Sequence, residues 1–548
     1  MLKKSKFSLL LALALVFSLV LSACGYGGSS EDSGDKKQEA VILESAELPD
    51  MDSVKATDTV SFTTLNNVME GLYRMDQNQE PIPAIADGEP EVNEDKTVYT
   101  FKLRDTKWSN GDPVTANDFV YAWQRSLDPK TESDYGPYMM SGKIKNADKV
   151  YAGKAKPSEL GIKAIDDKTL EITLEKPIPF IESLLAFPTF YPQNQKFIEE
   201  KGDNYAKNAE NLVYNGPYTL AKWEGSQATT WQYAKNDQYW DKDNVSMNKI
   251  TFNVSKDPQA AANAFEAGEA DVTPKLSTAA VLEKYQDDNR KVQWLEPTIF
   301  WLKMNQKNEA LANENIRRAI AMSFDKEALV NDVLQNGSVP AYYEVPQDFV
   351  KDESGKDFRE NGDFLKMNKE EAKKLFAQGL KELGQSEVTI NYLGDDTESA
   401  KTIASYMKDQ LEGTLDGLTL NIQSVPFATR IDRDTSENYD LQVAGWGPDY
   451  LDPITFSDLF ITDGGNNHMN YSNKKYDQLI NDAQNKLADK PEERWATLQE
   501  AEKVLLEEDA ALAPIYQRSS NVLVSDKLEG FTYHLVGPEY SYKWLKVK

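Results

Sequence analysis

The chain has 548 residues and a formal net charge of −28, from 61 basic and 89 acidic side chains. This length exceeds what one ordinary hydrophobic core fills and predicts two or three domains. The acidity excludes the basic surface that nonspecific nucleic-acid binding needs, so no nucleic-acid partner is expected. It chiefly indicates solvated faces, and a weak bias of a binding site toward cationic ligands is the alternative.

The N-terminus has the pattern of an export signal. Lys3, Lys4 and Lys6 precede an apolar run over residues 7–21. This run matches a secretory signal better than a membrane span, which needs about 20 apolar residues. Cys24 follows the run and is the single cysteine of the chain, which excludes an intrachain disulfide and a cysteine-based zinc site.

Residues 21–24, Leu-Ser-Ala-Cys, resemble the lipobox of bacterial lipoproteins. The resemblance implies that residues 1–23 are a lipoprotein signal peptide and that Cys24 carries the lipid, palmitate included. An incidental cysteine in an ordinary signal peptide is the alternative. Residues 24–39 are rich in glycine and serine and predict a flexible tether. We therefore expect a protein anchored by lipid on the extracellular face of the cell membrane.

Strand patterns recur along the chain. Apolar and polar residues alternate over 99–104 and again over 170–175, which is typical of strands with one wet face. Residues 166–168 predict a turn after another short strand. A further strand is predicted over 439–443.

Helix starts are marked by capping residues. Asp325 is predicted to cap a helix after a break at residues 322–325. Asn368 and Glu371 form a plausible capping box before a helical run that reaches residue 383. Ser472 is predicted to cap another helix. Strands and helices are mixed, which indicates an α/β fold class.

Catalytic chemistry finds little support. Only His468 and His534 are available for a triad, a metal site or a proton relay, and both are predicted to be structural or solvated. Residues 241–243 begin like a calcium loop but lack its glycine and its final glutamate. A surface glycosidase that uses paired carboxylates stays a distant alternative. We predict no enzyme, no cofactor and no metal.

Residues 444–453, AGWGPDYLDP, place Trp446 and Asp449 on a turn after the predicted strand. The residues alone allow a plain interpretation, in which Trp446 fills the core and Asp449 forms the turn. They also allow a binding site in which both contact a ligand.

Six segments in one order along the chain carry a family resemblance: residues 69–73 (MEGLY), 108–123 (WSNGDPVTANDFVYAW), 213–218 (VYNGPY), 265–271 (FEAGEAD), 315–320 (NIRRAI) and 444–450 (AGWGPDY). They resemble the extracytoplasmic oligopeptide-binding proteins of ABC importers, which are solute-binding proteins of family 5, the dipeptide/oligopeptide/nickel class. With the lipobox, the chain resembles the Gram-positive lipoproteins of that class.

The resemblance implies a two-lobed periplasmic-binding-protein-like fold of type II, in its large form with an extra subdomain and a cleft that closes about a hinge. Lobe one would comprise residues 40–69, 195–272 and 519–548. The extra subdomain would be residues 70–194, and lobe two residues 273–518. The resemblance also implies a monomer.

The resemblance favours the second interpretation of Trp446 and Asp449, in which both contact a ligand. Asp449 matches the position where the family holds the ammonium group of a peptide, whose burial without a counter-ion would be very unfavourable. Gly445 and Gly447 would let the ligand backbone pair as an added strand. Trp446 would supply a flat apolar wall.

Other contacts follow from the resemblance alone. Tyr135, Thr57, Thr59 and Tyr516 match or lie near family positions in the cleft or at its hinge side, and ordinary packing is the alternative for each. Val443 stands where one family arginine sits, which predicts a loosely set ligand length.

Two arginines lie near that position. Arg430 and Arg433 are off register and are expected to face solvent. Arg433 is nevertheless kept among the candidate ligand contacts.

The implied function is capture without chemistry. The protein would bind oligopeptides and deliver them to an ABC permease, whose transmembrane subunits work with cytoplasmic ATPases. A peptide-pheromone receptor, or a sibling that binds nickel, heme or an oligosaccharide, is the alternative within the same fold.

Overall fold

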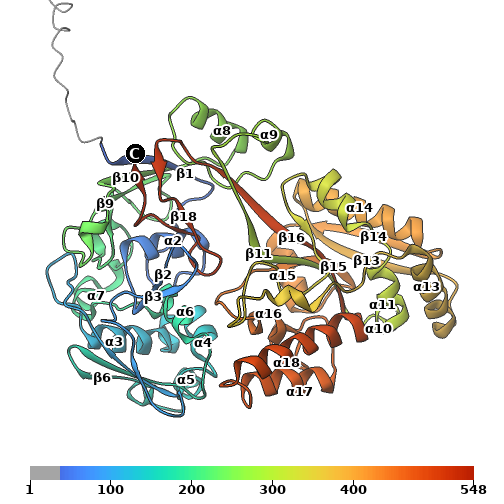
Figure 1. Ribbon diagram of the computed structural model, residues 1–548, viewed down its shortest axis with the longest axis horizontal. Coiled ribbons are helices and arrows are strands. Elements are labelled where there is room, and N and C mark those ends of the chain that lie inside the picture. Colours follow the sequence, from blue (N-terminus) through green and yellow to red (C-terminus); the bar gives the residue numbers. More distant parts are fainter. Residues whose placement is uncertain (1–36) are drawn as a thin grey trace, which may run out of the picture. The chain divides into compact units, whose positions relative to one another are not determined.

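The computed structural model describes residues 37–548, with only the backbone of Glu398 and Ala428. The predicted signal peptide, Cys24 and most of the predicted tether lie outside the described residues. Helices and strands are mixed along the chain (Figure 1), as the sequence predicts. Over the described range, every helix is too short or too polar to cross a bilayer.

The first sheet has the order β1-β10-β9-β8. Its strands are β1 (Glu39–Glu44), β8 (Tyr218–Ala221), β9 (Thr230–Lys235) and β10 (Lys249–Val254). Trp231, Tyr233 and Phe252 are buried on it, and they alternate along their strands as a half-buried sheet requires. β1 begins at Glu39, so the last residue of the predicted tether already pairs with Lys249.

The second sheet has the order β4-β5-β7-β6 and is antiparallel. Its strands are β4 (Glu91–Val92), β5 (Val98–Lys102), β6 (Ile162–Asp166) and β7 (Thr169–Thr173). β5 and β7 confirm the two predicted alternating strands, and the turn between β6 and β7 confirms the one predicted at residues 166–168. α3 (Ala116–Ser126) contacts this sheet at β6.

The third sheet is mixed and has the order β12-β16-β11-β15-β13-β14. Its strands are β11 (Lys291–Met304), β12 (Val339–Pro340), β13 (Val388–Asp395), β14 (Leu418–Val425), β15 (Leu441–Trp446) and β16 (Leu512–Leu523). β15 confirms the predicted strand in kind and lies two or three residues further along than predicted.

Two long strands link the first sheet to the third. β11 and β16 run side by side in Figure 1, paired from Lys291 and Leu523 at one end to Lys303 and Leu512 at the other. Just past β16, Val524 bridges to Val272, which also bridges to the first sheet at β1. β16 passes through the lobe boundary predicted at residues 518 and 519. The lobe boundaries as a whole stay a prediction.

Short ladders and helices complete the chain. The ladders join β2 (Tyr73–Met75) to β3 (Pro81–Pro83), β17 (Leu528–Glu529) to β20 (Lys546–Val547), and β18 (Thr532–Tyr533) to β19 (Tyr540–Ser541). The α-helices not yet given are α2 (Thr59–Val68), α4 (Tyr135–Met140), α5 (Ala147–Tyr151), α6 (Ile181–Leu185), α7 (Gln195–Lys201), α8 (Pro258–Glu266), α9 (Ala279–Glu283), α10 (Glu309–Ala312), α11 (Glu314–Ala321), α12 (Lys326–Ala328), α13 (Lys369–Leu383), α14 (Glu398–Thr414), α15 (Phe427–Thr435), α16 (Ile454–Ser457), α17 (Lys474–Gln484) and α18 (Pro491–Lys503).

The capping residues test the predicted helix starts. Asn368 accepts a hydrogen bond from the Glu371 amide at the start of α13, and Asp325 caps α12, so both predicted starts are confirmed. The third is displaced by one residue, because Asn473 rather than Ser472 caps α17. An Asn side chain caps as well as Ser does, so local preference could not choose between the two neighbours.

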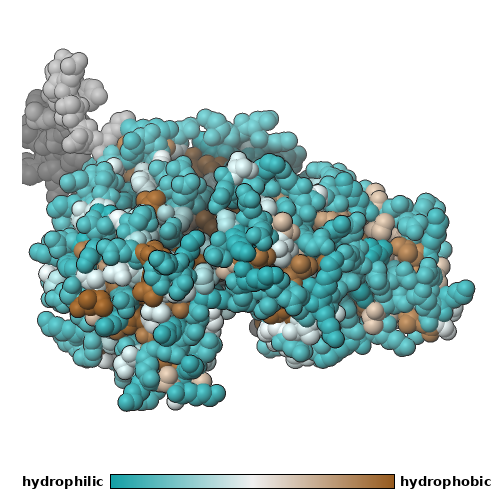
Figure 2. All heavy atoms as spheres, turned by 60° about the horizontal axis from the view of Figure 1, so that its bottom comes forward, coloured by the Kyte–Doolittle hydropathy of each residue, from teal (hydrophilic) through white to brown (hydrophobic). Residues whose placement is uncertain are grey.

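The surface agrees with the acidic composition. On the face that Figure 2 shows, hydrophilic residues make up most of the surface of the described part, and apolar residues form only small groups. The excess of acidic side chains accounts for this surface, because charged groups stay in water and repel one another.

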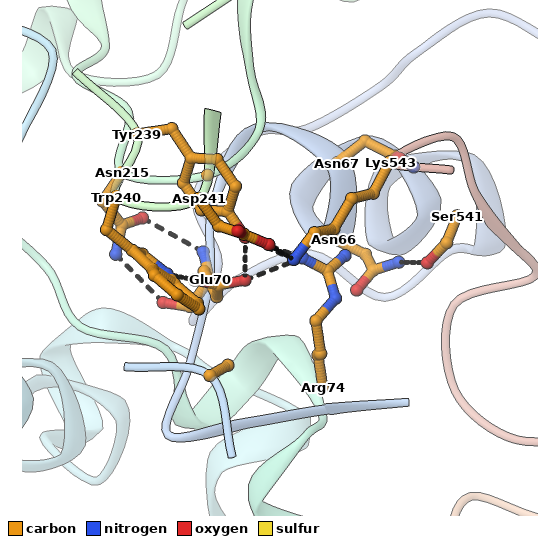
Figure 3. Close-up of polar contacts among 12 residues, drawn as sticks. Asn66, Asn67, Glu70, Arg74, Asn215, Tyr239, Trp240, Asp241, Ser541 and Lys543 are labelled. Atoms are coloured by element: carbon orange, nitrogen blue, oxygen red, sulfur yellow. Dashed lines mark hydrogen bonds and ion pairs between the residues drawn. The ribbon is translucent and has the colours of Figure 1, made fainter. Parts of the chain in front are cut away.

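A buried polar network ties the segment after α2 to distant parts of the chain (Figure 3). The Glu70 carboxylate accepts hydrogen bonds from Arg74 Nη1 at 2.7 Å, the Tyr239 hydroxyl at 2.6 Å and Trp240 Nε1 at 2.6 Å. Asn215 pairs with the Glu70 backbone at 3.0 and 3.1 Å. Glu70 and Arg74 are 1% and 2% exposed, so each charge depends on the other.

We predict that Glu70→Gln destabilises the protein by about 3–5 kcal/mol, because it leaves the buried Arg74 guanidinium without a counter-ion. Glu80→Gln is the matched control, since Glu80 is exposed, and surface changes usually stay within about 0.5 kcal/mol. Urea denaturation followed by circular dichroism measures both. Equal midpoints for the two variants would contradict the role of this pair.

Candidate functional site

The predicted binding turn begins where β15 leaves the third sheet. Trp446 is the last residue of β15 and pairs with Ile299 of β11. Three residues later, the half-buried Asp449 carboxylate accepts a hydrogen bond of 2.7 Å from the Tyr138 hydroxyl of α4. Burial raises the pKa of Asp449, while this hydrogen bond and the charge of Lys143 act in the opposite direction.

Asp449 has no counter-ion in the described part of the chain, since no Lys or Arg nitrogen lies within 4.0 Å of its carboxylate there. A carboxylate that is partly removed from water and holds one neutral donor is a favourable partner for a cationic group. The site can therefore bind an ammonium.

Two tyrosines of α4 line this turn. Tyr135 stacks on Phe187 with ring centroids 5.5 Å apart and lies edge-on to Tyr138 at 5.7 Å. Burial raises the pKa of Tyr135, and the charges of Asp449 and Asp58 raise it further. Tyr135 is therefore fixed by aromatic packing between the binding turn and the start of α2.

The start of α2 faces the glycine segment across a small cavity. Thr57 and Thr59 are both exposed. Thr59 lines a cavity of about 190 Å³ together with Gly447 and Thr298. It also borders a neighbouring cavity of about 420 Å³. The start of α2 and the glycine segment thus border one cavity.

The packing of the protein itself explains why residue 445 is a glycine. A Cβ atom there would lie 2.8 Å from the Phe300 ring, which is directly across the ladder. Phe300 stacks on Tyr516 with centroids 4.7 Å apart, and Tyr516 is buried. Tyr516 therefore packs against the Phe300 ring that lies next to Gly445, and in the described structure no hydrogen bond joins Tyr516 to Asp449.

Trp446 is half-buried and packs against the core. Its indole Nε1 is buried and has no hydrogen-bond partner in the described residues. Trp223, Trp231 and Trp301 in the core have the same unpaired Nε1 atom, so this atom does not distinguish a ligand contact from core packing at Trp446.

The arginines correct one prediction. Arg430 was expected to face solvent, but it is 6% exposed and donates to Asp395 at 2.8 Å and to Gln442 at 3.1 Å. Arg433 is half-buried and donates to Gln423 at 2.7 Å. Both lie on α15, where β13, β14 and β15 provide polar partners that the local sequence does not reveal.

Sequence reasoning missed three residues around Asp449: Tyr138, Lys143 and Asp458. Tyr138 follows Tyr135 by three residues, and such spacing places two side chains on neighbouring positions of a helix. That was the available signal for Tyr138. Lys143 and Asp458 gave no signal, because both lie outside the six resembling segments.

The two histidines have structural surroundings. His534 is buried with Nε2 2.7 Å from the Ser541 hydroxyl, and burial lowers its pKa to about 3, which keeps it neutral. His468 Nδ1 lies 3.7 Å from Asp434. Neither contacts Asp449.

Comparisons with known proteins identify the family. The family model of bacterial extracellular solute-binding proteins, family 5, matches residues 80–468. The oligopeptide-binding protein OppA of Bacillus subtilis is 33% identical over 98% of each chain.

Solved structures agree. Listeria monocytogenes OppA bound to peptide has a TM-score of 0.78 and 44% identity, over 93% of this chain and 99% of that one. The pheromone receptor PrgZ has a TM-score of 0.78 and 36% identity, over 94% and 100%. These likenesses confirm the predicted two-lobed fold, in a family of binding proteins. The chain belongs to the bacterial extracellular solute-binding proteins of family 5.

Proposed function

We propose that the protein captures oligopeptides outside the cytoplasm and delivers them to an ABC permease, whose cytoplasmic ATPases drive import. The observation that carries the proposal is the half-buried Asp449 carboxylate, which holds one neutral donor and no cation. It would neutralise the N-terminal ammonium of the peptide. The similarity to OppA proteins, one of them bound to peptide, supports this choice of ligand.

The peptide backbone would lie between the start of α2 and the end of β15. Gly447 and Thr59 line one cavity, and backbone pairing there would be independent of the ligand's side chains. Closure of the two lobes about a hinge near the β11–β16 pair would exclude bulk water and strengthen the charge pair. The protein performs no reaction in this proposal, and its partners supply the energy.

A free carboxyl end would find no dedicated cation beside Val443. Arg430 is already paired with Asp395, and Arg433 is held by Gln423. We therefore propose that ligand length is loosely set. The likeness to a pheromone receptor supports a second candidate function, in which one peptide is bound narrowly.

The anchor is also a proposal. Cys24 would carry a diacylglycerol thioether and, after cleavage, become the first residue. One such anchor and the tether would keep the body at the membrane without spanning it.

We predict that Asp449→Asn lowers the affinity for tetraalanine by about 100-fold or more, because truncating one partner of a buried charge pair is strongly unfavourable. N-acetylated tetraalanine should bind the unaltered protein just as poorly. Isothermal titration calorimetry measures both.

The matched control is Asp416→Asn, an exposed aspartate whose change should leave affinity unaltered. Acetylation should have little further effect in Asp449→Asn, since the ammonium site is already lost. Tight binding of the acetylated peptide by the unaltered protein would contradict the proposal.

Native mass spectrometry of the protein purified from cells should show a family of bound peptides with several lengths, because backbone pairing does not select side chains. A single peptide mass would instead indicate the pheromone receptor. A metal, heme or sugar mass would indicate the sibling transporters and would reject the peptide ligand.

Cys24→Ser should release the protein from the membrane fraction into the medium, because a serine cannot form the thioether. Intact mass spectrometry of the unaltered membrane form should show the diacylglyceryl adduct. Ser29→Ala, outside the lipobox, is the control and should stay membrane-bound. Unchanged partition of Cys24→Ser would refute the anchor.

A further inference from the structure

Another cavity, of about 200 Å³, is lined by Tyr450, the residue that follows Asp449. The 70–194 part of the chain lines it with Lys143, Lys176 and Phe180, and the 273–518 part with Tyr450, Asp458 and Arg494. Phe180 and Tyr450 stack with centroids 4.2 Å apart at one wall. The volume is below that of a typical ligand site, which starts near about 300 Å³, and suits one side chain.

The cavity adjoins the ammonium anchor through both of its walls. Tyr450 follows Asp449 directly in sequence and its ring lines the cavity. Tyr138 donates its hydroxyl to Asp449 and accepts a 3.4 Å hydrogen bond from Lys143 Nζ at its backbone carbonyl. The first side chain of a peptide branches one bond from the ammonium nitrogen, so it is the side chain that reaches this cavity.

The charges in the cavity lack partners. Within residues 37–548, no carboxylate lies within 4.0 Å of Lys143 or Lys176, and no cation lies that close to Asp458. Lys176 has one long hydrogen bond, 3.3 Å to Asn485. Arg494 differs, because Asp452 holds it with two bonds of 2.6 and 2.8 Å.

Burial acts on all three unpaired groups. It lowers the pKa of Lys143 and of Lys176, and it raises the pKa of Asp458 to about 7. The charges of Asp458 and Asp449 oppose this shift at Lys143, and the charge of Asp458 opposes it at Lys176. No carboxylate of the described residues lies within 4.0 Å of either amine, so both amines can still bind an acidic group.

We propose that this cavity receives the first side chain of the bound peptide and prefers a carboxylate, with Lys143 and Lys176 as the residues that determine this specificity. Aspartate or glutamate would bridge the two amines and complete their hydrogen bonds. A lysine or arginine would place like charges together in a partly dry space. This inference rests on the proposed function, because it needs the ammonium at Asp449.

Titration calorimetry with Glu-Ala-Ala-Ala, Gln-Ala-Ala-Ala and Lys-Ala-Ala-Ala tests the proposal on the unaltered protein. We expect the glutamate peptide to bind about 5- to 10-fold more tightly than the glutamine peptide, as one new charge pair of about 1 kcal/mol gives, and the lysine peptide to bind most weakly. The preference should shrink as salt is raised. Equal affinities for the three peptides would overturn the proposal.

Variants then locate the effect. Lys176→Gln should remove most of the preference for glutamate over glutamine, and Lys143→Gln with Lys176→Gln should abolish it. Lys145→Gln is the control, an exposed lysine in the same segment as Lys143, and should keep it. A full preference in the double variant would overturn the assignment.

The outcome separates the two proposals. If the peptides bind, N-acetylation weakens them and the first residue makes no difference, only the acidic preference is wrong. If no peptide binds, or acetylation has no effect, the proposed function itself has failed. The series on the unaltered protein decides this even where a variant does not fold.

Discussion

The pairing of β11 with both β15 and β16 is the constraint on which the rest depends. β11 lies between them, so Phe300 faces Gly445 on one side and Tyr516 on the other. A slip of one residue would turn Phe300 to the opposite face of the sheet and leave nothing beneath Gly445. The same ladder ends near Thr298 and Gly447 and so determines where the chain turns toward Asp449.

This ladder also connects the binding turn to the first sheet. β16 ends beside Val272, and Val272 bridges to β1. The strands that hold the site in register are therefore the strands that cross between sheets. A rotation of the first sheet relative to the third would bend the chain where β11 and β16 connect them. It would change the distance between Thr59 and Gly447 and leave the register of β15 intact.

Several buried charges elsewhere in the protein are paired, although Lys326, at 1% exposed, has no carboxylate within 4.0 Å in the described residues. Glu70 binds Arg74, Asp452 binds Arg494 and Glu502 binds Arg359, all with both side chains nearly inaccessible. Around Asp449 the pattern reverses, because its carboxylate, both nearby lysines and Asp458 are partly buried and lack ion-pair partners in the described chain. Charges left unpaired in a partly dry space are unfavourable unless a ligand completes them, so this contrast distinguishes the site from the ion pairs that stabilise the fold.

Several of the segments that reveal the family hold the fold together and do not line the site. Asn215 pairs with the backbone of Glu70, and a Cβ at Gly216 would lie 2.6 Å from the Met69 amide. Trp108 donates to Asp118, which closes the start of α3. Close contacts between segments tolerate few residue types, which explains why these segments carry recognisable sequence motifs.

The sequence by itself determined the local features. Asn368 and Asp325 cap their helices, the alternating residues form β5 and β7, and a carboxylate follows a strand and two glycines at position 449, because each depends on neighbours a few residues away. Tertiary structure alone decided which groups meet. It brought Tyr138 to Asp449 across 311 positions, buried Arg430 against Asp395, and placed Lys143 and Asp458 around one cavity. Such encounters depend on strand register and on how distant segments pack, and these are global properties that no short stretch of residues encodes.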